Sequence, residues 1–106
     1  TWCAPCKEEM PSLDLLQDQK KLDKLIIFPI NVGQDNLENS AKFFEDLKIK
    51  NLKIYFDNPI TLAKKFGLRG IPTSILFNKD GLEFARIVGS IDFNDKKFIN
   101  WLAKYN

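Results

Sequence analysis

The chain has 106 residues, about the size of one domain, and residues 1–106 are expected to form a single unit. Its hydrophobic fraction of 44% and charged fraction of 28% are typical of a globular protein. The 16 basic and 14 acidic residues leave a net charge of +2, which argues against nucleic acid or an anionic membrane as a partner. The longest apolar run, residues 25–30, is far shorter than the roughly 20 residues of a membrane-spanning helix.

The first third of the chain predicts a helix followed by a strand. Residues 3–22 carry apolar side chains along one helical stripe, and Pro11 inside this helix predicts a kink because it removes a backbone hydrogen bond. Residues 25–32 form a continuous apolar run, which predicts a strand that is buried on both faces, as parallel strands are.

The middle of the chain repeats the alternation of helix and strand. Residues 35–47 predict a second helix that begins with a capping box at Asp35, and "KIYF" at residues 53–56 predicts a second strand. A third helix is predicted between Asn58, which can cap its start, and Gly67, which can end it.

The last third predicts a hairpin and a final helix. Residues 73–77 and 82–88 have strand character, and the Asp80-Gly81 pair between them predicts an antiparallel turn. Apolar residues then recur at helical spacing, with Asp92 as the expected cap. The alternation along the whole chain indicates an α/β domain in which helices cover a mixed sheet.

Cys3 and Cys6 are the only cysteines, and the chain contains no histidine. Two cysteines cannot complete a tetrahedral zinc site, so they form a disulfide staple, a redox couple or half of an intermolecular metal clip. At the start of a helix this spacing puts their Cα atoms near the roughly 5.5 Å that a disulfide prefers. Because the closed loop is very short, oxidation adds little stability through chain entropy. The spacing therefore favours redox chemistry over the other two uses, and over two inert core cysteines.

The two cysteines are expected to have different roles. Cys3 lies at the positive end of the helix, where free N–H groups favour a thiolate, so we expect it to be the nucleophile and to lie nearer the solvent. Cys6 is expected to be more buried and to resolve the mixed disulfide. Trp2 is expected to shield one side of Cys3.

The chain resembles the thioredoxin superfamily in "WCAPC" and in the later "GIPTSILF" followed by a hairpin. The spacing CxxCxxExP, formed here by Cys3, Cys6, Glu9 and Pro11, is similar to that of the TlpA/ResA/CcmG-like branch. That branch contains extracytoplasmic bacterial thiol-disulfide oxidoreductases, often membrane-anchored and often linked to cytochrome c maturation. The additional helix and strand within residues 35–57 also match it.

The resemblance implies roles for three further residues. Pro72 matches the family's cis-proline beside the disulfide, and Ile71 would offer its backbone to an extended substrate peptide, so both are expected to bind substrate together with Trp2. Glu9 matches an acidic residue that could relay protons to and from Cys6 if burial raises its pKa. The alternative for Glu9 is a solvated surface glutamate like Glu8.

The resemblance also implies a function for the whole protein. It predicts a reductant that exchanges disulfides with protein substrates, apocytochrome c being a candidate, and that takes electrons from an upstream thiol protein. The expected protein is a monomer without a cofactor or metal, located in the periplasm or anchored in a membrane and facing it. The alternatives are a general cytosolic thioredoxin, a thiol peroxidase and a non-catalytic binding module with the same fold.

The first residue of the chain coincides with the redox motif. In thioredoxin-like folds a central strand leads directly into the active-site helix, and Thr1 comes after the place of that strand. The strands at residues 25–30 and 73–77 are expected to lie on either side of it. We therefore expect this chain to be the C-terminal portion of a thioredoxin-like domain, without the central strand.

Overall fold

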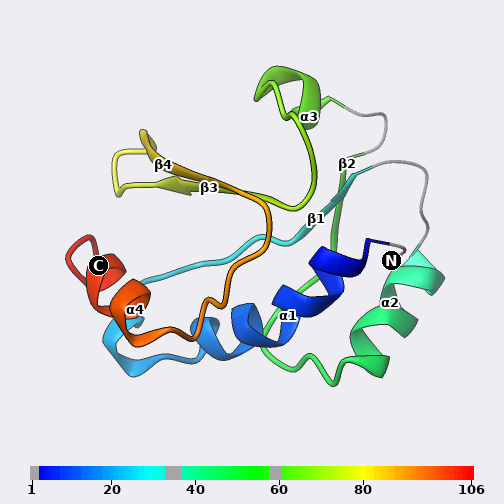
Figure 1. Ribbon diagram of the computed structural model, residues 1–106, viewed down its shortest axis with the longest axis horizontal. Helices are drawn as coiled ribbons and strands as arrows, with labels where there is room; N and C mark the ends of the chain where they lie inside the picture. Colours follow the sequence, from blue (N-terminus) through cyan, green and yellow to red (C-terminus); the bar gives the residue numbers. More distant parts are fainter. Residues whose placement is uncertain (1–2, 33–36, 58–60) are drawn as a thin grey trace.

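A computed structural model describes residues 3–32, 37–57 and 61–106 of the chain. The predicted roles of Trp2, Asp35 and Asn58 therefore lie outside the described residues. Figure 1 shows the arrangement of the elements, with the β3–β4 hairpin and α3 on one side of β1 and helices α1 and α4 on the other. The elements follow the chain as α1 (Ala4–Gln17), the 3₁₀ turn η1 (Lys20–Leu22), β1 (Ile30–Val32), α2 (Leu37–Asp46), β2 (Tyr55–Asp57), α3 (Leu62–Lys65), β3 (Thr73–Phe77), β4 (Glu83–Val88) and α4 (Lys96–Ala103).

The described strands form two separate two-stranded sheets. Strands β1 and β2 are parallel, and Ile30 pairs with Tyr55. Strands β3 and β4 are antiparallel, and Thr73 pairs with Val88. The α/β class is confirmed, with parallel and antiparallel pairs both present, but within the described ranges the two pairs are not hydrogen-bonded into one mixed sheet.

Helix α1 is shorter than predicted because the chain leaves the helix at Gln17. The side-chain amide of Gln17 donates to the Leu25 carbonyl over 2.7 Å and accepts from the Ile27 N–H over 2.7 Å. The side chain thus binds the backbone of the next segment, and residues 20–22 form only the turn η1. Pro11 lies inside α1 as predicted.

The apolar run at residues 25–32 is only partly a strand. Residues 30–32 form β1, whereas Ile26 is 69% exposed and Phe28 is 58% exposed. Ile27 is half-buried and Pro29 is buried, so burial alternates along the segment. The prediction that this segment is buried on both faces is wrong, because the described chain covers only one of its faces.

Helix α3 is held at its start by Asp57, the last residue of β2. The Asp57 carboxylate accepts hydrogen bonds of 2.9 Å from each backbone N–H of residues 61–63. These bonds hold the pKa of Asp57 below its ordinary value, and the bond from the Leu62 N–H has the largest effect. Gly67 ends the helix at a φ of +62°, as predicted, in a conformation that glycine adopts readily.

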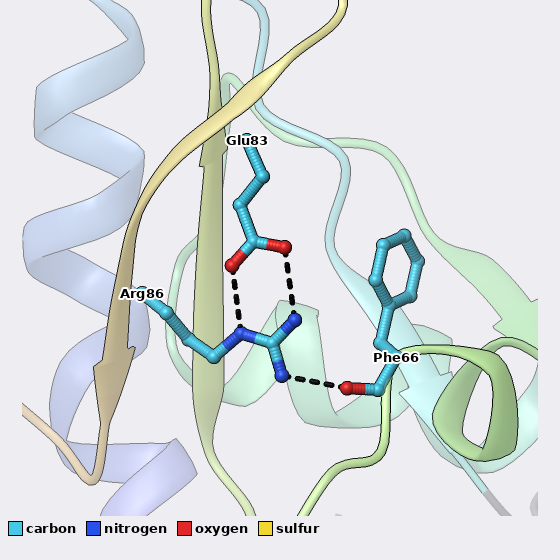
Figure 2. Close-up of polar contacts among 3 residues, drawn as sticks. All are labelled: Phe66, Glu83 and Arg86. Atoms are coloured by element: carbon cyan, nitrogen blue, oxygen red, sulfur yellow. Dashed lines mark hydrogen bonds and ion pairs between the residues drawn. The ribbon is translucent and has the colours of Figure 1, made fainter.

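Arg86 connects β4 to the end of α3, as Figure 2 shows. Its guanidinium donates two hydrogen bonds of 2.9 Å to the Glu83 carboxylate and one of 2.6 Å to the Phe66 carbonyl. The exposed ion pair by itself stabilises the fold by at most about 1 kcal/mol. The bond from Arg86 to the Phe66 carbonyl fixes the start of the loop at residues 67–72, which leads into β3.

Helix α4 begins at Asp95 instead of the predicted Asp92. The Asp95 carboxylate accepts from the Phe98 N–H over 3.1 Å, which is the usual contact of a cap. Asp92 accepts from the Asn94 N–H over 2.9 Å and so forms a tight turn before the helix. Both aspartates can bond a nearby N–H, and the turn places the second of them at the helix start.

The buried core lies where α1, η1 and α4 meet. Leu22 is the most deeply buried side chain, at 1% exposure, and half-buried side chains of the hairpin pack against this cluster. The core consists of Leu16, Leu22, Phe93, Ile99 and Leu102.

Within the described residues, no helix has the length and apolar content needed to cross a bilayer.

Asp14 ties α1 to the segment after α2. Its buried carboxylate accepts from the Lys50 N–H over 3.1 Å and from the Asn51 N–H over 2.6 Å. We expect Asp14→Ala to lower the free energy of unfolding by about 2–3 kcal/mol, because both N–H groups lose a charged acceptor. Urea denaturation measures this loss, and Asp18→Ala, an exposed control, should change stability by no more than about 0.5 kcal/mol. Equal stability of the two variants would contradict the assignment.

Candidate active site

The two cysteines lie in the first turn of α1. Cys3 is the N-cap residue, and its sulfur accepts a hydrogen bond of 3.2 Å from the Cys6 backbone N–H. The two sulfurs are joined in a disulfide, with the Cα atoms 5.2 Å apart. That separation agrees with the distance that the spacing predicts. The first turn of α1 therefore accommodates the disulfide.

The exposure of the two cysteines is the reverse of the prediction. Cys3 is buried, with 8% exposure, whereas Cys6 is half-buried. The reason is that the N-cap sulfur lies over the first turn of its own helix, where the Cys6 N–H binds it. The choice of Cys3 as the nucleophile therefore depends on the N–H groups around its sulfur and not on solvent exposure.

Glu9 lies one turn after Cys6 and is buried, with 4% exposure, whereas its neighbour Glu8 is exposed. Its Oε2 atom has no hydrogen-bond partner among the described residues. Burial raises the pKa of Glu9 from its ordinary value of 4.5 to about 7, and a hydrogen bond from the Ile91 backbone partly offsets this effect. The alternative of a solvated surface glutamate is therefore excluded.

Ile71 and Pro72 form the end of the loop that precedes β3. The peptide bond between them is cis. Pro72 is buried, and its carbonyl accepts a hydrogen bond of 2.8 Å from the Gly89 N–H. Ile71 is 40% exposed, and no described residue is hydrogen-bonded to its backbone N–H or carbonyl. The backbone N–H and carbonyl of Ile71 therefore have no hydrogen-bond partner within the described residues.

Five predicted site residues line one cavity of about 690 Å³. Apolar side chains of β1 and β3 also line it, so the cavity lies between the two sheets. Trp2, the sixth predicted site residue, lies outside the described residues. In the part of the chain that the structure describes, no group of three or more cysteine, aspartate or glutamate side chains could hold a metal ion. The five residues are Cys3, Cys6, Glu9, Ile71 and Pro72.

Sequence reasoning missed Ser12. Its hydroxyl donates to the Glu9 carbonyl over 2.8 Å and accepts from the Phe93 N–H over 3.0 Å. A serine inside a helix, directly after Pro11, is only a weak indication of a functional residue, because serine hydroxyls in helices often bond a carbonyl of the preceding turn. The second contact joins residues 81 positions apart and has no local pattern in the sequence.

A disulfide at a helix N-terminus, one turn before a buried carboxyl group and in a cavity shared with an X–Pro loop, is typical of thioredoxin-like redox domains. The family model of the thioredoxin-like domain matches residues 1–106, so this chain belongs to that family. The predicted thioredoxin-like fold is thereby confirmed.

Among known proteins, the chain is similar to thiol-disulfide oxidoreductase ResA of Geobacillus thermodenitrificans, with 31% identity over 92% of this chain and 55% of that protein. It is 33% identical to the thiol:disulfide interchange protein DsbE of Pseudomonas aeruginosa, over 87% of this chain and 48% of that protein. The chain thus spans about half the length of the curated relatives that it matches. These similarities confirm the predicted resemblance to the ResA-like branch.

A solved structure has the same fold. The crystal structure of StoA from Bacillus subtilis superposes with a TM-score of 0.76, at 24% identity, over 98% of this chain and 74% of that chain. The agreement covers nearly all of this chain, and it therefore supports the fold as a whole.

Proposed function

We propose that the protein is a thiol-disulfide oxidoreductase that reduces disulfides of protein substrates through Cys3 and Cys6. The observation that carries this proposal is the cavity that is lined by the disulfide-forming cysteine pair, the buried Glu9 and the Ile71–Pro72 loop. The names of the relatives, ResA and DsbE among them, support the same chemistry.

The reaction begins with the dithiol form. The Cys3 thiolate attacks one sulfur of the substrate disulfide, forms a mixed disulfide and releases the other substrate sulfur as a thiolate. The Cys6 thiol then loses its proton, and its thiolate attacks the Cys3 sulfur. This second step forms the Cys3–Cys6 disulfide and releases the reduced substrate, so two electrons pass from the enzyme to the substrate.

Glu9 is the proposed proton acceptor in the second step. Its carboxylate takes the proton of Cys6, and the released substrate thiolate takes up a proton from the solution or from Glu9. A base with a pKa of about 7 is suited to both directions near neutral pH. The free Oε2 atom is the oxygen to which this proton can go.

The Ile71 backbone is the proposed docking point for the substrate. An extended segment that carries the target cysteine can pair with the unbonded N–H and carbonyl of Ile71, as a short added strand. Pro72 is proposed to close the site on the side of the sulfurs, and Trp2 to cover the other side. These contacts would hold the substrate sulfur in line with Cys3.

For the cellular role, we propose an extracytoplasmic reductant with protein disulfides as substrates and with apocytochrome c as a candidate among them. An upstream thiol protein would return the Cys3–Cys6 disulfide to the dithiol. The proposed protein acts as a monomer without a cofactor. The resemblance to the ResA-like branch supports this role, and a general cytosolic thioredoxin is the alternative. Thiol trapping in fractionated cells would distinguish the two compartments.

The proposal predicts stoichiometric reduction of a protein disulfide. The dithiol form, freed of reductant, should reduce insulin disulfides and end with Cys3 and Cys6 oxidised, as mass spectrometry after alkylation would show. Protein alkylated at both cysteines beforehand is the control and should be inactive. Peroxide turnover without reduction of insulin would instead indicate a thiol peroxidase, and loss of neither thiol would indicate a binding module.

A further inference from the structure

Residues 89–93, the first part of the connection from β4 to α4, contact both the Pro72 loop and α1 through their backbone. At the start of this segment, the Gly89 N–H donates to the Pro72 carbonyl over 2.8 Å. At its end, the Phe93 N–H donates to the Ser12 hydroxyl over 3.0 Å. Between them, the Ile91 N–H is hydrogen-bonded to the Glu9 carboxyl group. One short segment therefore connects the Pro72 loop to the helix that carries the cysteines.

Ser12 holds this segment on α1 at the level of Glu9. The Ser12 side chain is half-buried, and its hydroxyl is both a hydrogen-bond acceptor and a donor. It accepts from the Phe93 N–H and donates to the Glu9 carbonyl over 2.8 Å. Besides the Glu9 carboxyl group, the Ser12 hydroxyl is the only α1 side-chain group of the described residues that is hydrogen-bonded to the 89–93 segment. Loss of the hydroxyl would free the Phe93 N–H and loosen the segment two residues from Ile91.

We propose that Ser12 is a positioning residue, which anchors the 89–93 segment on α1 and thereby fixes where the Glu9 carboxyl group lies relative to the cysteine pair. This inference rests on the proposed function, in which Glu9 accepts the proton of Cys6. Ser12 touches neither sulfur nor substrate in this assignment and acts only through Glu9.

The surroundings of Glu9 make its ionisation sensitive to this anchor. The Ile91 N–H is the contact that favours the carboxylate, and no charged side chain of the described residues shifts the pKa of Glu9. Cys3 and Cys6, which carry titratable thiols once their disulfide is reduced, line the same cavity as Glu9. The other titratable side chains along its wall are Lys24, Asp57, Lys79 and Tyr105. If Ser12 no longer holds the segment, the Ile91 bond weakens and the pKa of Glu9 rises further.

The test is a pH titration of the full protein by NMR, which follows the Glu9 carboxyl carbon and the Ile91 amide proton. Ser12→Ala should raise the Glu9 midpoint by roughly half a unit to one unit, the equivalent of one net hydrogen bond. Ser12→Thr keeps a hydroxyl and should restore the midpoint. Ser90→Ala is the matched control, because the exposed Ser90 side chain makes no hydrogen bond within the described residues.

The outcomes separate this inference from the proposed function. A Glu9 midpoint that is equal in the wild type and in Ser12→Ala would overturn the positioning role, whatever the reductase activity. A wild-type Glu9 that titrates with a midpoint of about 7, in a protein whose dithiol form does not reduce insulin, would instead contradict the proposed function. If Ser12→Ala does not fold, the wild-type titration still tests the proposal. The proposal is refuted if the chemical shift of the Ile91 amide proton does not change together with the ionisation of Glu9.

Discussion

Cys3→Ser will lower the rate of protein disulfide reduction to that of the reaction without enzyme, because no thiolate remains at the α1 N-terminus to attack the substrate. Serine in the same place can accept the Cys6 N–H but is a very poor nucleophile towards sulfur. The rate is measured with insulin and the reduced protein. Leu15→Ser, a comparable change at an exposed position of the same helix, should keep wild-type activity.

The two cysteine variants should also differ in what they trap. Cys6→Ser retains the attacking thiolate but cannot resolve the mixed disulfide, so it should accumulate covalent complexes with substrate. Cys3→Ser should accumulate none. Non-reducing gel electrophoresis with mass spectrometry identifies the complexes. If only Cys3→Ser traps complexes, then Cys6 is the attacking thiol and Cys3 the resolving one. The test is sharp because Cys6 is the more exposed of the two cysteines, so exposure alone would favour Cys6 as the attacking thiol.

Glu9→Gln should slow the resolution of the mixed disulfide by about 10²- to 10⁴-fold above neutral pH, the usual contribution of a general base. In the wild type, Glu9 ionises with a pKa of about 7, so the rate of resolution should rise as the pH increases through that value. Glutamine cannot accept the proton, and the rate should then follow only the ionisation of the Cys6 thiol at higher pH. Stopped-flow measurement of the second step across the pH range provides the profile.

Glu8→Gln is the matched control, because Glu8 precedes Glu9 on the same helix and is exposed. Its profile should coincide with that of the wild type. An inflection near pH 7 that persists in Glu9→Gln would assign the titration to another group and would remove Glu9 from the mechanism.

The same carboxyl group should make stability depend on pH. The folded protein holds the Glu9 proton up to a pKa of about 7, whereas the unfolded chain releases it near 4.5. Between these values the folded state binds more protons, so stability is greatest below the lower value and falls as the pH rises through the higher one. Glu9→Gln should remove this part of the fall, which urea denaturation at several pH values would detect.

Much of this site could be predicted because its chemistry lies within one turn of helix. The spacing of Cys3 and Cys6 alone implies a short disulfide, since the positions i and i+3 are neighbours on any helix. The hairpin was likewise predictable from Asp80-Gly81, and Gly81 has a φ of +80° there. In these places the backbone geometry of a few consecutive residues determines the outcome.

Capping showed the limit of such local reasoning. Several aspartates and asparagines near the start of a helix have the same capping propensity, and sequence alone does not rank them. For α4 the turn at Asp92 moved the cap to Asp95, and for α3 the end of β2 supplied the Asp57 carboxylate. The neighbouring turn or strand decided which of the equivalent side chains was in place.

Burial was decided by the tertiary structure. Glu8 and Glu9 are chemically identical neighbours, yet only Glu9 is buried, and its carboxyl group interacts with the backbone of Ile91 from the far end of the chain. Ile26 and Phe28 belong to an apolar run that predicted a buried strand, but the described chain packs on one face only. The sequence by itself determined the cysteine pair, the class of the fold and most of its elements, because these follow from local spacing and periodicity. Only the packing of distant segments determined which groups lose their water, and therefore which carboxyl group can exchange a proton near neutral pH.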